Sequence, residues 1–239
     1  MHRSGIAFGV ALVSALAATA IHAMPPPPFA PLRSPQVPVL TNLLQSYLNG
    51  VGESIRVDTD QRAQLSFTAA QFVCRPPYSW QLELWRSPAS TDSIGIYNAA
   101  EATPLLMRIF PAEATSGWFE AISFRTAPAR LVVNVFDASA NFVDPHVYLG
   151  VDQTNVAFWL QGAAGPLYMQ DARNPTGAAQ MLVFAGTGIN SGGAWICMED
   201  QSVGAGSDED YADAILFVGY GCGDPVRKST WGAVKQRFR

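Results

Sequence analysis

The chain has 239 residues and a formal net charge of −4, with 49% hydrophobic and 14% charged residues. This composition supplies enough apolar material for a folded core and argues against a disordered chain. The lack of a basic excess argues against a protein body that binds nucleic acid. The charge is uneven: no Lys or Arg lies between Asn174 and Val226, whereas five lie between Arg227 and Arg239.

Residues 1–23 have the pattern of a secretory signal peptide. Arg3 supplies the positive start, an apolar stretch follows, and either Ala18-Thr19-Ala20 or Ile21-His22-Ala23 fits a cleavage site. A membrane anchor is the alternative, but the stretch is short for a span of about 20 residues and prolines follow at once. We therefore expect an exported protein that is secreted or located at the cell surface.

After the signal, residues 24–40 are Pro-rich and predict an extended linker. Leu43, Leu44, Tyr47 and Leu48 have helical spacing and predict one short helix, which ends at Asn49-Gly50. The rest of the chain to residue 220 predicts short strands separated by turn residues. The expected strands are 54–57, 64–73, 80–86, 93–97, 105–110, 118–125, 130–137, 147–151, 155–161, 167–170, 180–185, 194–199 and 214–220.

This succession predicts an all-β protein, an antiparallel β-sandwich of jelly-roll type with one short N-terminal helix. One domain over residues 41–224 is the simplest division, followed by a basic tail over residues 225–239. In the tail, Trp231, Val234 and Phe238 recur at helical spacing beside basic residues. The tail is either an amphipathic segment, read by a sorting system or lying on a membrane, or a frayed terminus.

The cysteines and the one histidine outside the signal give little sign of catalysis. Cys197 lies inside a predicted strand and reads as a buried small hydrophobe, which leaves Cys74 and Cys222 as the expected disulfide. His146 has no Gly-x-Ser-x-Gly partner, so a serine hydrolase triad is not expected. We assign no catalytic residue.

Acidic residues crowd both sides of the loop that joins the last two predicted strands. A hairpin would bring Glu199 and Asp200 on one arm close to Asp208, Asp210 and Asp213 on the other. Close carboxylates repel one another by about 1 kcal/mol per pair in water. A bound Ca²⁺, which takes oxygen ligands, would relieve this repulsion. The alternative is a solvated turn in which Asp side chains accept bonds from their own backbone.

Two other functions use the same residues. A carbohydrate-active enzyme needs only two carboxylates at a set separation, which the cluster could supply. A Ca²⁺-dependent lectin-like module would add aromatic side chains, and Trp85, Trp118, Trp159 and Trp195 are candidates. Tryptophan in a strand of a β-sandwich belongs more often to the core.

The acidic hairpin resembles the signature of a bacterial exported family, the domain of unknown function 4114. Trp195-Ile196-Cys197-Met198-Glu199-Asp200 precedes Gly206-Ser207-Asp208-Glu209-Asp210-Tyr211-Ala212-Asp213 and a further apolar strand, as in that family. Residues 155–220 match the family best, the similarity extends loosely over residues 80–220, and residues 93–98 resemble a stretch that often precedes the domain. Ala212 stands where the family usually has Asn, and Ser207 where it has a second Gly. The resemblance implies a secreted, mostly β domain without an assigned biochemical role.

Together these observations predict a secreted or surface-associated, non-enzymatic β-sandwich that is stabilised by Ca²⁺. Its expected role is structural, adhesive or ligand-binding, and the candidate partners are a cell-surface or matrix component or a glycan. The enzyme and the lectin remain the alternatives. Neither the ligand nor the oligomeric state follows from the sequence.

Overall fold

The computed structural model describes residues 29–72, 78–88, 90, 92–204 and 206–219. The predicted signal peptide, the predicted Cys74–Cys222 disulfide and the tail over residues 225–239 lie outside these ranges. The described chain forms one α-helix, eleven strands and three short 3₁₀ helices. They are α1 (Leu43–Gly50), η1 (Ala69–Phe72), β1 (Tyr78–Arg86), β2 (Ile94–Asn98), β3 (Met107–Phe110), β4 (Phe119–Thr126), β5 (Ala129–Phe136), β6 (Phe142–Leu149), β7 (Val156–Gly162), β8 (Gly165–Tyr168), η2 (Asp171–Arg173), β9 (Met181–Ala185), η3 (Gly188–Asn190), β10 (Ala194–Met198) and β11 (Ala214–Gly219).

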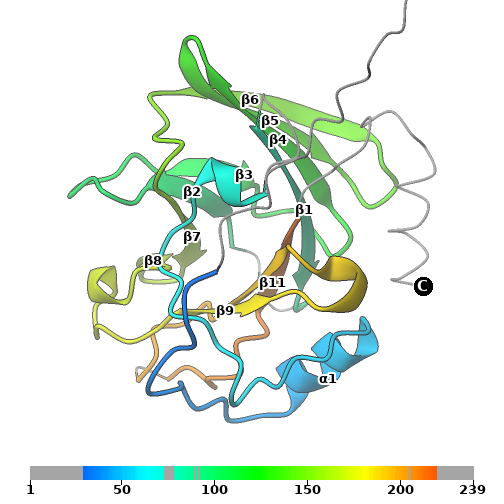
Figure 1. The fold of residues 1–239 in the computed structure, drawn as a ribbon, viewed down its shortest axis with the longest axis vertical. Coiled ribbons are helices and arrows are strands. Elements are labelled where there is room, and N and C mark those ends of the chain that lie inside the picture. Colours follow the sequence, from blue (N-terminus) through cyan, green and yellow to red (C-terminus); the bar gives the residue numbers. More distant parts are fainter. Residues whose placement is uncertain (1–28, 73–77, 89, 91, 205, 220–239) are drawn as a thin grey trace, which may run out of the picture.

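The strands form two antiparallel sheets, which confirms the predicted all-β sandwich with a single short helix. The larger sheet has seven strands in the order β6-β5-β4-β1-β11-β10-β9, and the smaller has four in the order β3-β2-β7-β8. Every strand pair is antiparallel. Figure 1 shows β4, β5 and β6 toward one end of the molecule and α1 at the other. The jelly-roll pattern of connections stays a prediction.

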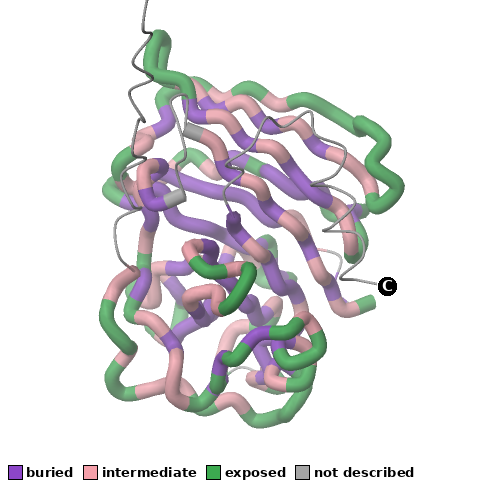
Figure 2. Tube along the Cα trace, turned by 45° about the vertical axis from the view of Figure 1, so that its right-hand side comes forward, coloured by how far each residue is buried: buried purple, intermediate pink, exposed green. Residues whose placement is uncertain are grey.

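The main core lies between the two sheets. Trp80, Leu82 and Leu84 of β1 alternate with residues that are less buried, as expected for a strand with one face on a core. The Trp80 ring lies 4.7 Å from Phe124 and 5.9 Å from Phe158, measured between centroids, so one indole joins the two sheets. Figure 2 shows the buried residues running along the strands of the larger sheet.

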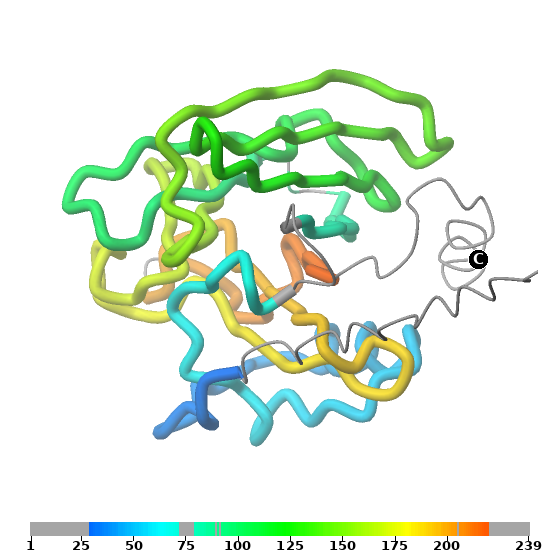
Figure 3. Tube along the Cα trace, turned by 45° about the horizontal axis from the view of Figure 1, so that its top comes forward, coloured from blue at the N-terminus to red at the C-terminus, as the bar shows by residue number. Residues whose placement is uncertain are grey.

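A second core covers part of the other face of the larger sheet. Leu44 and Leu48 of α1 are fully buried, and they belong to one cluster with Leu182, Trp195 and Ile215 from β9, β10 and β11. The helix therefore packs on this sheet from outside the sandwich. Figure 3 shows that α1 lies far from the strands β4 to β6 (residues 119–149).

The segment between α1 and β1 differs from the prediction, because residues 54–57 and 64–72 form irregular chain, a turn, one isolated bridge at Phe67 and the 3₁₀ helix η1 in place of strands. Side chains satisfy much of its backbone. The Gln45 amide donates to the Ile55 carbonyl at 2.8 Å and accepts from the Val57 N–H at 2.9 Å. The Gln61 side chain accepts from the Val37 N–H and donates to the carbonyls of Val37 and Val57. A backbone paired in this way needs no neighbouring strand.

Two further segments differ from the prediction. β6 begins at Phe142 and includes Pro145, whereas the predicted strand began at residue 147; a free edge strand tolerates proline. Residues 29–40, expected as a linker, lie against the body of the protein. There Arg33 forms an ion pair with Asp171 at 2.8 Å, and Leu32 bridges to Arg62.

Candidate metal centre

The acidic residues lie in the loop that joins two central strands of the larger sheet. β10 ends at Met198, which pairs with Ala214 at the start of β11. The two ends of the loop, residues 199 and 213, therefore lie next to each other at the edge of these strands. The predicted hairpin is therefore present. The Asp200 N–H donates to Asp213 Oδ2 at 2.9 Å and closes the base of the loop.

The loop turns back on itself through residues with left-handed backbone conformations. Glu209 and Tyr211 have φ angles of 52° and 54°, which residues other than glycine rarely adopt. Surrounding bonds hold them: the Tyr211 hydroxyl donates to the Ala179 carbonyl at 2.9 Å, and the Leu40 N–H donates to the Glu209 carbonyl at 3.1 Å. Tyr211 is fully buried. The loop is thus anchored to the body and does not extend freely into solvent.

Four carboxylates converge within this loop. One oxygen each from Glu199, Asp208, Asp210 and Asp213 lies within 4.8 Å of the others. Glu199 is only 1% exposed, whereas Asp208 is exposed. Oxygens that bind Ca²⁺ lie about 2.3–2.6 Å from the ion, so two on opposite sides are about 5 Å apart. The four oxygens are close enough to share one such ion.

The electrostatics of the cluster disfavour four free negative charges. Burial, followed by the charges of Asp213 and Asp208, raises the pKa of Glu199 to about 8, although the Tyr211 N–H opposes this shift. Burial is also the main reason that the pKa values of Asp210 and Asp213 are raised. Among the described residues, no Lys or Arg appears as a cause of these three shifts. The cluster therefore needs either bound protons or an external cation near neutral pH.

Asp200, the fifth predicted ligand, is not part of this group. It follows Glu199 directly and its carboxyl lies beside Asp213, but it does not belong to the set of four oxygens that lie within 4.8 Å of one another. Burial, followed by the charge of Asp213, raises the pKa of Asp200 to about 6. Its side chain lines a neighbouring pocket. The structure therefore favours Glu199, the other residue that we considered for this position.

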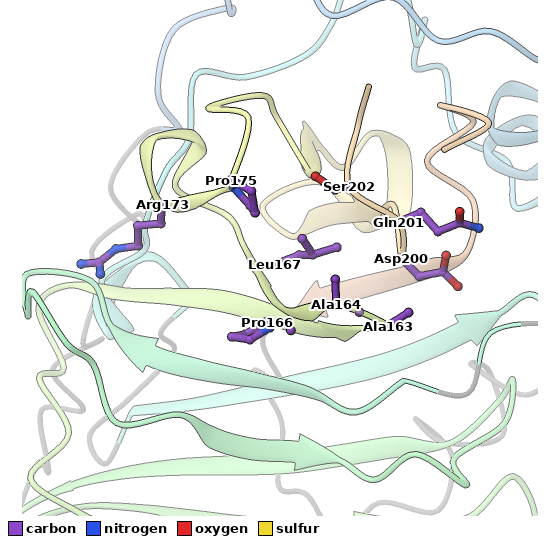
Figure 4. A pocket seen from close by; sticks show the side chains of 11 residues that line it. Ala163, Ala164, Pro166, Leu167, Arg173, Pro175, Asp200, Gln201 and Ser202 are labelled. Carbon is purple, nitrogen blue, oxygen red and sulfur yellow. The ribbon is translucent and has the colours of Figure 1, made fainter. Parts of the chain in front are cut away.

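The pocket beside Asp200 has a volume of about 390 Å³, near the lower end of the range for small-molecule sites. The β7–β8 turn forms one wall, where Gly162 comes so close to Asp200 that an added Cβ would meet the Asp200 carbonyl oxygen at 2.7 Å. Figure 4 shows Asp200 and Arg173 at opposite ends of the lining, with Leu167 and Ala164 between them. The Arg173 guanidinium is already bonded to Gln170 and to backbone carbonyls.

Sequence reasoning missed one supporting residue, Gln180. It is fully buried and accepts the Glu199 N–H at its carbonyl oxygen, at 3.1 Å. With the side-chain amide assigned to the orientation that satisfies both ends, it donates to the Gln201 carbonyl and accepts from the Val203 N–H, each at 2.9 Å. Gln180 thereby ties the first arm of the loop to β9. A glutamine at the first position of the predicted strand 180–185 was the available signal.

The other candidate residues from the sequence, a cysteine and four tryptophans, lie in the cores or pack against them. Cys197 is buried and free, and burial raises the pKa of its thiol. Trp159 and Trp195 are buried, at 5% and 2% exposure, while Trp85 and Trp118 pack against the cores. Among the described residues, these tryptophans therefore belong to the core and not to an open aromatic site.

The fold and the acidic loop together define an antiparallel β-sandwich with a four-carboxylate centre. No family model matches the chain, and neither a curated protein nor a solved structure matches it. In the part of the chain that the structure describes, no helix has the length and apolar character needed to cross a membrane.

Proposed function

We propose that this chain is an exported, secreted or cell-surface β-sandwich that binds Ca²⁺ at Glu199, Asp208, Asp210 and Asp213. Its role is structural, adhesive or ligand-binding, and its resemblance to the domain of unknown function 4114 is part of this proposal. The observation that carries it is the convergence of the four carboxylates within 4.8 Å around a nearly buried Glu199. The ion would fix the β10–β11 loop on the sandwich.

The arrangement supports a metal centre better than a glycosidase pair. Carbohydrate hydrolysis uses two carboxyl groups about 5–9.5 Å apart on either side of a substrate. Here four groups face one point, and a cation at that point would occupy the space of the substrate. The enzyme alternative therefore has weaker support.

The Ca²⁺-dependent lectin alternative is favoured by one observation, the pocket that is lined by Asp200. The Asp200 N–H donates to Asp213 Oδ2, so one residue connects the pocket with the four-carboxylate centre. A glycan array probed with Ca²⁺ and with excess chelator tests this alternative. Binding that requires Ca²⁺ supports the lectin, and no binding in either condition supports a structural role.

The proposal predicts that Ca²⁺ raises the melting temperature. Extracellular sites commonly have Kd values of about 10⁻⁴–10⁻³ M, so 5 mM Ca²⁺ would stabilise the folded state by about 1–2 kcal/mol. For a chain of this size, calorimetry should show a rise of about 2–9 °C relative to excess chelator. The substitution Asp208→Asn removes a ligand at an exposed position and should abolish most of this rise.

The matched control is Asp58→Asn, which changes an exposed aspartate outside the cluster. This variant should keep the full response to Ca²⁺. An unchanged melting temperature of the parent protein at millimolar Ca²⁺ would reject the metal centre.

A further inference from the structure

Among the described residues, the outer face of the larger sheet is covered at one end only. Over β9, β10 and β11, the helix α1 and its flanking residues bury Leu182, Trp195 and Ile215. Over β5 and β6, none of the described helices lies on this face (Figures 1 and 3). Because the sheet has seven strands spaced about 4.8 Å apart, an eight-residue helix is too short to cover its whole width.

The uncovered end of this face is apolar. In β6, Val147 pairs with Val132 of β5, and Leu149 pairs with Arg130. Leu131, between these two β5 residues, belongs to the main core. Val147 and Leu149 therefore lie on the opposite, outer face of the sheet. They are 59% and 66% exposed. We call these outward or bulged apolar side chains the β5–β6 patch, which consists of Val132, Phe136, Phe142, Val143, Val147 and Leu149.

An aromatic row crosses this end of the sheet. Phe136 stacks on Phe119 with a centroid distance of 4.9 Å, and Phe142 meets Phe136 edge-on at 5.7 Å. Phe142 is still 56% exposed and Val143 is 46% exposed. A contiguous apolar surface of this kind usually contacts another molecule or another part of the chain.

We propose that the C-terminal tail, residues 225–239, packs on the β5–β6 patch. The tail lies outside the described residues, and its sequence places Trp231, Val234 and Phe238 on one side of a helix. Lys235, Arg237 and Arg239 would remain in solvent. The tail would then cover one end of the outer face as α1 covers the other.

The tail starts close enough to reach the patch. β11 ends at Gly219, which pairs with Gln81 of β1, and the same level of the sheet continues through Ala121 and Asn134 to Pro145. β5 and β6 are three and four strands away, about 14 and 19 Å. Residues 220–230 can span more than about 30 Å when extended. A helix over residues 231–239 is about 14 Å long, similar to five residues of β5.

A second copy of the chain is the other possible occupant. β6 is a free edge of the larger sheet, but Pro145 removes a backbone donor from its middle, which disfavours the addition of another strand. A second copy would therefore have to pack on the face. The tail has the advantage of permanent proximity, since it belongs to the same chain.

Limited trypsin digestion of the full chain tests the proposal, because the tail contains Lys228, Lys235 and Arg237. We expect Val147→Asp to accelerate cleavage in the tail about tenfold, equivalent to about 1.4 kcal/mol of lost docking. Val147 is exposed, so the substitution should leave the sandwich folded. The matched control, Ile189→Asp, changes an apolar side chain that is 75% exposed outside the patch and should leave the cleavage rate unchanged.

Equal cleavage rates in the parent and in Val147→Asp would overturn the proposal. Light scattering of a chain ending at Asp224 gives a second measurement. A dimer at micromolar concentration in both the full and the shortened chain would make a second copy the occupant and would also overturn it. This inference does not depend on the acidic centre, so its failure would leave the Ca²⁺ proposal intact.

Discussion

At the scale of single residues, Glu120 is a costly side chain in the core. It lies on β4 between Leu82 and Val135, is fully buried, and neither carboxyl oxygen has a hydrogen-bond partner among the described residues. Burial raises its pKa well above the usual value of 4.5. An unpartnered polar group in such a place costs about 1–3 kcal/mol.

We therefore predict that Glu120→Leu stabilises the protein at pH 7 by about 1–3 kcal/mol in urea unfolding. The folded state keeps the Glu120 proton above the pH at which the unfolded state loses it. The stability of the parent protein should therefore fall as pH rises above about 4.5, and the variant should lose this part of the pH dependence. The exposed Glu113→Leu change is the control and should shift stability by less than about 0.5 kcal/mol. A less stable Glu120→Leu protein would show that the carboxyl has a partner.

Residue-scale features were the least accessible from the sequence. Alternation along β4 separates Glu120, Ile122 and Phe124 from Phe119, Ala121 and Ser123, but the pattern alone does not show which set faces the core. The sequence likewise did not show whether Glu199 or Asp200 joins the other carboxylates. Both acids follow the end of β10 and both lie near Asp213, and only the three-dimensional loop decides which one joins the four converging oxygens.

At the scale of elements, the helix α1 buries two leucine side chains completely. Leu44 and Leu48 are fully buried against the outer face of the sheet, whereas Leu43 is 48% exposed. Leu44→Ala and Leu48→Ala should each lower the free energy of unfolding by about 2–5 kcal/mol, since each leaves a cavity. Leu43→Ala changes the same residue type in the same helix and should cost less than about 0.5 kcal/mol. Similar losses for all three variants, measured by urea unfolding, would contradict the packing described.

The accuracy of the predicted elements follows from where each one lies. Strands with a buried face, such as β1, β4 and β10, carry the alternating or continuous apolar pattern and were predicted close to their limits. The segment 54–73 carries a similar pattern, but glutamine side chains satisfy its backbone, and such long-range bonds leave no local signal. β6 was predicted only from residue 147, and its edge position, which tolerates Pro145, became clear only from the sheet order.

At the scale of the whole molecule, the four-carboxylate centre links stability to pH and, under the proposed function, to Ca²⁺. With no ion bound, the raised pKa of Glu199, about 8, means that the folded state holds a proton that the unfolded state loses near pH 4.5. The contribution of Glu199 to the free energy of unfolding is fully present below that pH. It is lost as pH rises toward 8, at no more than about 1.4 kcal/mol per pH unit. Ca²⁺ displaces the same proton, so its binding should strengthen over this range.

We therefore expect the rise in melting temperature caused by 5 mM Ca²⁺ to be several degrees larger at pH 8 than at pH 5. Calorimetry at both pH values, with Ca²⁺ and with chelator, measures the four combinations. In Glu199→Gln the side chain keeps its shape but no longer titrates, so chelated protein should become less sensitive to pH. A Ca²⁺ effect of equal size at both pH values would mean that the ion binds away from Glu199, because only a ligand that exchanges a proton for the metal couples the two equilibria.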